Sequence, residues 1–190
     1  MIERDMDRPL KTAIVIGSIR EERLADSLLD WLMATLEAFP EIEPYIIDPR
    51  ELGVTPWHGD MGSDALRRLR QSLAEADGFI VLTPEYNHSF PGALKSLIDA
   101  GKDEWSRKPV GFISYGGISG GLRAVEQLRL VFAELRSHTL RDTVSFANPW
   151  AQIDNDSVFS PPAQSMDALH AQIDDYSWWA RLLRMGRETA

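Results

Sequence analysis

Short apolar runs alternate along the chain with segments whose leucines recur every three or four residues. Five runs carry apolar residues in succession or in alternation and end near glycine, proline or polar turn residues; they cover 13–16, 43–47, 79–82, 110–114 and 140–146. Apolar runs of this length, bounded by turn residues, are typical of β-strands that lie inside a protein. The pattern therefore predicts five strands.

Helical spacing fills the intervals between these runs. After Ser18, the residues Leu24, Leu28, Leu32 and Leu36 recur at intervals of four, which predicts a helix with Ser18 as its N-cap. Similar spacing predicts four further helices, over 63–77, 91–98, 122–135 and 166–184. Strands and helices that alternate in this way predict an α/β fold with a doubly wound, mostly parallel sheet.

The chain reads as one domain over residues 1–190, because no repeat or composition boundary divides it. Residues 1–10 are expected to form a flexible N-terminus, and 148–162 a polar loop before the last helix. A doubly wound sheet binds its ligands beyond the carboxyl ends of its strands, near the point where the strand order reverses. We therefore expect a site in the loops after the first, third and fourth strands.

Composition restricts the partners of this domain. Twenty Lys and Arg against 29 Asp and Glu give a formal charge of −9, so we expect no nucleic-acid partner. The absence of cysteine excludes disulfides, thiolate nucleophiles and cysteine-ligated metals. No apolar run reaches the roughly 18 residues of a membrane span. Because Met1 to Leu10 also lacks the apolar core of a signal peptide, we expect a cytoplasmic protein.

The loop after the first strand carries donors suited to a phosphate. Gly17 permits a tight turn, and the following amides, the Ser18 hydroxyl and the Arg20 guanidinium can face one anion. The alternative is an ordinary strand–helix turn with a solvated arginine. The single glycine does not match the three-glycine dinucleotide fingerprint, and the chain has no Gly-Lys-Ser or Gly-Lys-Thr. The loop therefore favours a mononucleotide.

Two prolines stiffen the loop after the third strand. Pro84 and Pro91 bracket Tyr86 and Asn87, so that the backbone groups between them can be held at fixed positions for a flat polar ring. Tyr86 could stack on such a ring or lie beside it. The alternative is a rigid turn whose tyrosine packs in the core.

Four glycines lie in the loop after the fourth strand, at Gly116, Gly117, Gly120 and Gly121. Glycine inside regular structure costs roughly 0.5 to 1 kcal/mol relative to alanine, so the cluster indicates that something approaches the backbone closely. The edge of a planar ring at Gly116 and Gly117 would explain it. A flexible link before the next helix would explain it as well.

The residues of these loops resemble the NADPH-dependent FMN reductase family, which includes quinone, chromate and azo-dye reductases. The resemblance rests on Gly-Ser-x-Arg at 17–20, Thr-Pro-Glu-Tyr-Asn at 83–87, Pro-Gly-x-Leu-Lys at 91–95 and Ser-x-Gly-Gly at 114–117. It implies a flavodoxin-like fold, whose five-stranded parallel sheet has the order 2-1-3-4-5 and helices on both faces. It also implies FMN as the cofactor, NADPH or NADH as the electron donor, and a quinone, a flavin or a similar small molecule as the acceptor.

The resemblance also implies residues for the FMN site. Ser18 and Arg20 would hold the phosphate, with Arg23 as a weaker candidate. The isoalloxazine ring would be bordered by Pro84, Glu85, Tyr86 and Asn87, and on another edge by Ser114, Gly116 and Gly117. Because the flavin carries the chemistry, no catalytic acid or base is assigned. Glu21 and Glu22 depart from the family pattern, in which small or basic residues are common at these positions. Two carboxylates near a phosphate weaken its binding unless they point to solvent.

The resemblance also bears on oligomeric assembly, and the sequence leaves alternative functions open. Members of the family commonly form dimers or tetramers with the flavin near an interface, and Trp178 and Trp179 indicate either core packing or a subunit contact. A flavodoxin-type electron carrier and a flavin-free binding or regulatory module are the alternative functions. A metal site is not expected, because no ligand spacing relates the four histidines His58, His88, His138 and His170.

Overall fold

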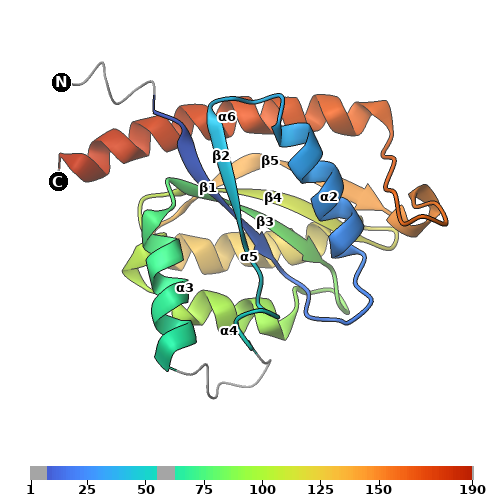
Figure 1. The fold of residues 1–190 in the computed structure, drawn as a ribbon, viewed down its shortest axis with the longest axis horizontal. Helices are drawn as coiled ribbons and strands as arrows, with labels where there is room; N and C mark the ends of the chain where they lie inside the picture. The colour runs from blue at the N-terminus through green and yellow to red at the C-terminus, as the bar shows by residue number, and fades with distance from the viewer. Residues whose placement is uncertain (1–7, 55–62, 190) are drawn as a thin grey trace.

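The computed structural model describes residues 8–54 and 63–189. It contains one five-stranded sheet with the order β2-β1-β3-β4-β5, in which every neighbouring pair is parallel (Figure 1). The strands are β1 (Leu10–Ile16), β2 (Ile42–Ile47), β3 (Gly78–Pro84), β4 (Pro109–Gly116) and β5 (His138–Ala147). The predicted five strands and the strand order are confirmed.

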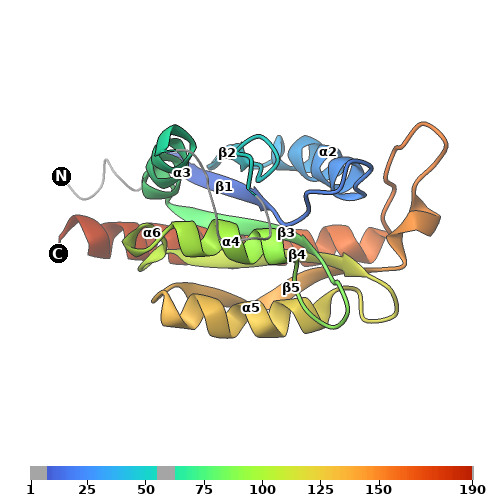
Figure 2. The ribbon, with the colours of Figure 1, turned by 90° about the horizontal axis from the view of Figure 1, so that it is seen from below.

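Helices cover both faces of this sheet (Figure 2). They are α2 (Ala25–Leu36), α3 (Ser63–Glu75), α4 (Gly92–Ala100), α5 (Leu122–Glu134) and α6 (Ala163–Glu188), with short 3₁₀ turns η1 (Asp103–Trp105) and η2 (Pro149–Gln152). On one face α2 and α6 bury Ile14 of β1, and on the other α3, α4 and α5 bury its neighbour Val15. This alternation is that of a strand covered on both sides. Within the described ranges, no helix has both the length and the apolar composition that crossing a membrane requires.

The first helix begins later than the sequence predicts. Residues 17–24 form a loop, and Leu24 rather than Ser18 occupies the N-cap position of α2, without a side-chain hydrogen bond. The Arg23 guanidinium donates to the carbonyl oxygen of Ser18 at 2.8 Å, which is the acceptor that a helix starting there would use for its first backbone bond. The prediction of Ser18 as an N-cap is therefore wrong, and the loop after β1 is longer than expected.

The ends of two predicted segments also differ. Leu10 is buried and begins β1, so the predicted flexible N-terminus of residues 1–10 is wrong at its end; residues 1–7 lie outside the described ranges. The carbonyl oxygens of Arg8 and Pro9 accept hydrogen bonds from Arg184, which attaches this segment to α6. The last helix covers 163–188 rather than 166–184.

The polar segment 148–162 is folded onto the domain. Ile153 and Phe159 form an isolated β-bridge, and Phe159 is only 5% exposed. Its ring lies edge-on to Phe146 at 4.9 Å and to Trp31 at 5.8 Å between ring centroids. Phe159 therefore anchors this segment to the domain.

Candidate functional site

The loops after β1, β3 and β4 lie at one edge of the sheet. These strands are neighbours and run in the same direction, so their carboxyl ends meet. The N–H of Gly17 donates to the Leu82 carbonyl oxygen at 2.8 Å, and the N–H of Glu85 donates to the Tyr115 carbonyl oxygen at 2.9 Å. Adjacent loops are thereby joined in pairs. The structure thus brings the three segments of the predicted site together.

Gly17 is required by the packing of this edge. A Cβ atom at Gly17 would lie 2.9 Å from the Thr83 Oγ1 and 3.1 Å from the Leu82 carbonyl oxygen. At these distances the neighbouring atoms of β3 would have to shift to make room for a side chain. The glycine therefore allows the first loop to leave β1 directly against the end of β3.

The loop 17–24 leaves several donors without partners. Within the described ranges, no hydrogen bond is made by the N–H groups of Ile19, Glu21 and Glu22. Arg20 is exposed, and its guanidinium carbon lies 4.3 Å from the centroid of the Tyr86 ring, where a cation–π contact holds it. Free backbone N–H groups beside an arginine are donors that an anion can accept. This donor set fits a phosphate.

Tyr86 also reaches the hydroxyl of Ser18. The two hydroxyl oxygens lie 2.9 Å apart, and Ser18 is 1% exposed. Tyr86 therefore contacts both side chains that the sequence assigns to the phosphate, one through its hydroxyl and Arg20 through its ring. The alternative of a tyrosine packed in the core is not what the structure shows, since Tyr86 is only half-buried.

Arg23 faces the protein rather than the space beside the loop. Its guanidinium pairs with both carboxylate oxygens of Asp48, with a 2.9 Å bond to one of them, and its Nε donates to Asp26 at 2.7 Å. The Arg23 side chain is 5% exposed, and the hydrogen bonds to Asp48 hold its pKa above the ordinary value. Burial would raise the pKa of Asp48, but the bonds from Arg23 outweigh burial and lower it. Most of the donor capacity of Arg23 is therefore used within the fold.

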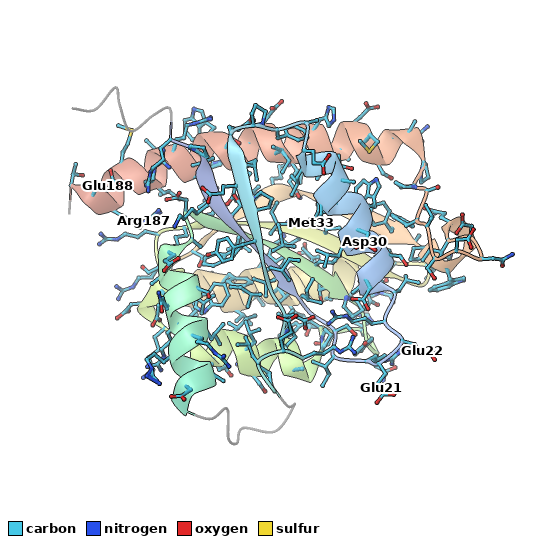
Figure 3. All side chains as sticks on the ribbon, viewed as in Figure 1. Glu21, Glu22, Asp30, Met33, Arg187 and Glu188 are labelled. Atoms are coloured by element: carbon cyan, nitrogen blue, oxygen red, sulfur yellow. The ribbon has the colours of Figure 1, made fainter. Side chains whose placement is uncertain are left out.

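Glu21 and Glu22 lie at the outside of the same loop. Both are exposed, and Figure 3 shows them at the rim of the molecule with their carboxylates directed away from the sheet. A carboxylate in water interacts weakly with a charge several ångströms away, since the solvent screens it. Their orientation removes the objection that they raise against a phosphate site.

The second loop contains a tight turn at Tyr86–Asn87–His88–Ser89. Asn87 and His88 have φ angles of 49° and 73°, and Tyr86 and Ser89 exchange backbone hydrogen bonds of 2.8 and 3.1 Å. Two positive φ angles identify a type I′ turn, which is strained for a residue such as histidine. Gln127 of α5 braces it, because its amide donates to the His88 carbonyl oxygen and accepts from the Ser89 hydroxyl. The backbone bonds within the turn and the two bonds to Gln127 therefore account for the rigidity that the sequence predicts for this loop.

Glu85 connects the second loop to the third. Its carboxylate, 7% exposed, accepts hydrogen bonds from the Ser119 hydroxyl at 2.6 Å and from the Arg123 backbone and side chain at 3.2 and 3.1 Å. Burial alone would raise the pKa of Glu85, but these hydrogen bonds outweigh it and lower the pKa. The Glu85 carboxylate therefore joins the second loop to the third loop, and the side chain is not directed to a ligand.

The glycines of the third loop have two different functions. Gly120 and Gly121 have φ angles of 61° and 88°, and a Cβ atom at Gly121 would lie 2.7 Å from the Tyr115 backbone nitrogen. These two are needed for the fold of the loop. Gly117 is exposed, and a Cβ atom there would meet no other described atom within 4 Å. The open space beside Gly117 fits the edge of a flat ring.

Ser114 supports this loop from below. It is 0% exposed, and its hydroxyl donates to the Gly120 carbonyl oxygen at 2.8 Å, beside a similar bond of 2.9 Å from Ser145. A fully covered hydroxyl that already donates cannot reach a ligand in the open space. Ser114 therefore shapes the loop that carries Gly116 and Gly117.

The sequence profile of the NADPH-dependent FMN reductase family matches residues 10–151, a range that contains all three loops. The chain belongs to this family. The resemblance inferred from the loop motifs is thereby confirmed.

Relatives within the family differ in how much of the chain they match. The NAD(P)H-dependent FMN reductase ntnL of a Nectria species is 31% identical over 131 residues, which are 62% of this chain and 65% of the relative. The 2-hydroxy-1,4-benzoquinone reductase of a Burkholderia species is 32% identical over 117 residues, or 60% and 58%. A quinone reductase of Pseudomonas putida is 26% identical over 192 residues, or 94% and 99%. The chain thus spans less than two thirds of the first two relatives and almost all of the third.

Solved structures show the same fold. The flavoenzyme NAD(P)H:(acceptor) oxidoreductase FerB of Paracoccus denitrificans has a TM-score of 0.70 at 20% identity, covering 90% of this chain and 97% of FerB. The apo form of the NADH:FMN oxidoreductase EMOB also has a TM-score of 0.70 at 20% identity, covering 89% of each chain. These similarities support the flavodoxin-like architecture of the family.

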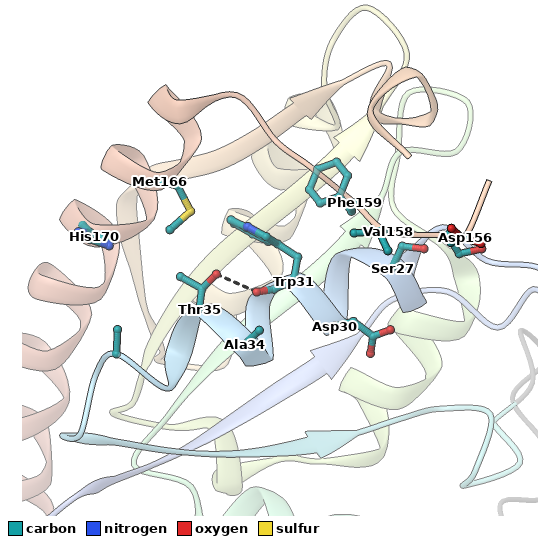
Figure 4. Close-up of a pocket in the computed structure, with 12 residues that line it drawn as sticks. Ser27, Asp30, Trp31, Ala34, Thr35, Asp156, Val158, Phe159, Met166 and His170 are labelled. Atoms are coloured by element: carbon teal, nitrogen blue, oxygen red, sulfur yellow. Dashed lines mark hydrogen bonds between the residues drawn. The ribbon is translucent and has the colours of Figure 1, made fainter. Parts of the chain in front are cut away.

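A separate cavity of about 600 Å³ lies between α2, the segment 156–159 and the start of α6 (Figure 4). Its described lining includes Trp31, Phe159 and the acidic Asp30 and Asp156, and it contains no Lys or Arg. An anionic cofactor has no counter-charge there. The cavity therefore does not compete with the three loops as a site for a phosphate.

The described histidines lie on separate elements: His88 in the turn after β3, His138 on β5 and His170 on α6. His58 lies outside the described residues. No group of three metal-ligating side chains occurs in the part of the chain that the structure describes.

Proposed function

We propose that this protein is an NAD(P)H-dependent oxidoreductase that binds FMN without a covalent bond and passes its electrons to a quinone, a flavin or a similar acceptor. The observation that carries the proposal is the arrangement of the three loops. Unpaired amides and Arg20 lie at one end of the edge, and open space beside Gly117 lies at the other. Such an edge suits a ligand with an anionic tail and a flat polar ring.

The phosphate would be held by Arg20 and by the free amides of the loop 17–24. Ser18 would contribute its hydroxyl once the bond to Tyr86 has rearranged, and Tyr86 positions both side chains. Arg23 would act indirectly, because its bonds to Asp48 and to the Ser18 carbonyl oxygen fix the shape of the loop.

The ring would lie between the second and third loops. Pro84 through Asn87 would border it mainly through backbone groups, while Glu85 holds the loops at a fixed separation. Gly116 and Gly117 would form the opposite edge, with Ser114 supporting them through Gly120. The flavin, when bound, supplies hydride acceptance and electron donation, and the protein supplies orientation and electrostatics. No side chain is needed as a catalytic acid or base.

A quinone is the acceptor class that the surface and the relatives favour. Ile118, beside Gly117, is 88% exposed, and Trp150 just beyond β5 is 57% exposed. Apolar side chains at the mouth of the site suit a flat, neutral acceptor better than a charged one. Relatives are named quinone reductase and 2-hydroxy-1,4-benzoquinone reductase. We also propose a homo-oligomer that acts in the cytoplasm, where NAD(P)H is available.

Two measurements on purified protein test the proposal. Titration with FMN followed by an absorbance spectrum should show a bound flavin, and NADPH or NADH should then bleach it. Steady oxidation of the nicotinamide in the presence of a benzoquinone is expected. Flavin binding without nicotinamide oxidation would instead identify an electron carrier, and no response to added FMN would identify a flavin-free module.

A further inference from the structure

The cavity of about 600 Å³ beside α2 has no part in the function proposed above (Figure 4). One wall of it is formed by α2 and the residues just after this helix, whose lining side chains recur every three or four residues along one side: Ser27, Asp30, Trp31, Ala34, Thr35 and Ala38. The segment 156–159 and the start of α6 form the other walls. Because Ala34 and Ala38 have small side chains, this side of α2 leaves space of the size that small-molecule sites have.

The lining of the cavity is largely apolar and partly aromatic. Trp31 is half-buried and Phe159 is 5% exposed, and their rings lie edge to face with centroids 5.8 Å apart. Val158 and Met166 add further apolar atoms. Ligand sites are commonly apolar surfaces with a few polar groups that fix the orientation of the ligand. The apolar lining therefore suits an organic molecule better than a simple ion.

Two carboxylates provide the charge of this cavity. Figure 4 shows Asp30 and Asp156 on the side of Val158, whereas Met166 and His170 lie on the opposite side. Within the described ranges, neither carboxylate forms a salt bridge. The described lining also contains no lysine or arginine. The negative charge at this end of the cavity therefore has no counter-charge from the chain.

The neighbouring acidic residues differ from these two. Asp26, one turn earlier on α2, accepts a hydrogen bond from the Arg23 Nε at 2.7 Å. The Asp154 carboxylate accepts two backbone N–H groups of its own turn at 2.9 Å each, and one of them belongs to Asp156. Asp154 therefore fixes the turn that carries Asp156. The fold uses the carboxylates of Asp26 and Asp154, and it leaves those of Asp30 and Asp156 available.

We propose that this cavity binds a small organic cation, with its ammonium group at Asp30 and Asp156 and its apolar body against Trp31 and Phe159. The carboxylates attract the charge, and the faces of aromatic rings attract alkylated ammonium groups. A neutral ligand would leave the two carboxylates without a counter-charge, and an anion would be repelled by them. The cavity shares no residue with the three loops, so this site goes beyond the function proposed above.

Isothermal titration calorimetry of the full chain with benzyltriethylammonium tests the chemical class of the ligand. We expect a Kd of about 1 mM or lower, as for a ligand of this size in a partly open site. Added salt should weaken the binding, because it screens the two carboxylates. Phenylmethanesulfonate, which has the same ring but a negative charge, should not bind. Equal binding of the sulfonate, or no binding of the cation at about 10 mM, would overturn the proposal.

Substitutions in the cavity test its charge and its space separately. Asp30→Asn with Asp156→Asn should weaken binding of the cation about tenfold, since each exposed ion pair contributes little. Glu43→Gln with Glu134→Gln removes the same charge from β2 and α5 and should leave the affinity unchanged. Ala34→Leu fills the cavity without a change of charge and should prevent binding. An unchanged affinity in the double aspartate variant or in Ala34→Leu would overturn the proposal.

Two further measurements separate this site from the flavin site. The affinity for the cation should be the same with and without saturating FMN, and displacement of the cation by FMN would overturn the proposal. In a methyl NMR spectrum, the cation should shift the signal of Met166, assigned by its loss in Met166→Leu, but not that of Met185. A shift of Met185 alone would also overturn it. Cation binding by a chain that does not bind FMN would contradict the function proposed above while supporting this site.

Discussion

The two edges of the sheet use polar groups in opposite ways. At the amino edge, Asp77 is buried and accepts hydrogen bonds from the Lys11 N–H and from the guanidinium groups of Arg184 and Arg187. At the carboxyl edge, Arg20 is exposed and its neighbouring amides have no partner within the described ranges. The charges around Asp77 are satisfied within the fold, whereas Arg20 and its neighbouring amides stay available for a ligand.

Lys108 belongs to the first of these edges. It is 4% exposed, and its Nζ donates to the carbonyl oxygens of Leu73 and Ala74 at 2.6 and 3.0 Å, at the end of α3. Burial is the main cause that lowers its pKa to about 8, with a further contribution from the charge of Arg187. A charge at this edge therefore completes a helix terminus rather than a binding site.

Removal of the Asp77 carboxylate at the amino edge should have the largest effect on the free energy of unfolding. Asp77→Asn leaves Arg184 and Arg187 close together without the anion between them, and we expect the free energy of unfolding to fall by about 3 to 5 kcal/mol. Urea denaturation measures the loss, and the affinity of the folded fraction for FMN should stay unchanged. Asp142→Asn, on an exposed carboxylate, is the matched control and should change stability by less than about 0.5 kcal/mol. Equal effects of the two substitutions would remove the distinction between the edges.

The next effect is the pH dependence of stability that Lys108 causes. The pKa of Lys108 is about 8 in the folded protein, against an ordinary value of 10.5 in the unfolded chain, so between these two pH values the unfolded chain binds more protons. This group therefore makes the free energy of unfolding rise with pH across that window, by about 3 kcal/mol in total. Lys108→Met should lack this rise. Urea denaturation of both proteins near both ends of the window measures the difference, and identical slopes would contradict the assigned cause.

Substitution of the two arginines of the first loop should separate binding from folding. Arg20→Ala should weaken FMN binding by about 1.5 to 3 kcal/mol, the contribution of a hydrogen bond to a charged group, with little change in Tm. Arg23→Ala should mainly lower Tm, because it removes the guanidinium that pairs with the buried carboxylate of Asp48. Quenching of FMN fluorescence measures the affinity and differential scanning calorimetry the Tm. An unchanged FMN affinity in Arg20→Ala would show that this residue is not a phosphate ligand.

The smallest expected effect concerns Tyr86. Tyr86→Phe removes the hydroxyl that contacts Ser18 but keeps the ring on which Arg20 lies, so FMN binding should weaken by only about 1 kcal/mol. Tyr86→Leu removes both contacts and should weaken binding further. If the two variants bind FMN equally, the cation–π contact does not position Arg20.

Much of the fold could be predicted because its signals are local. Apolar runs bounded by glycine and proline identified all five strands, and leucine spacing identified the helices that cover them. The start of α2 was predicted too early. Leu24 has the same spacing as the leucines of α2, although it lies just outside the helix. The burial of Phe159 was not predicted, because a single buried aromatic residue in a polar segment gives no periodic pattern.

The site residues also divide into those whose place the sequence predicts and those whose role only the tertiary structure shows. Sequence alone determined which loops meet, since the order of neighbouring strands follows from the family motifs and places three carboxyl ends together. Only the tertiary structure decided that Arg23 pairs with Asp48, that Glu85 pairs with Arg123, and that Ser114 supports a turn instead of facing a ligand. The partners in the first two pairs lie 25 and 38 residues apart in the chain. Periodicity reports which face of an element is buried, whereas the partner of a buried charge depends on which distant segment the fold places against it.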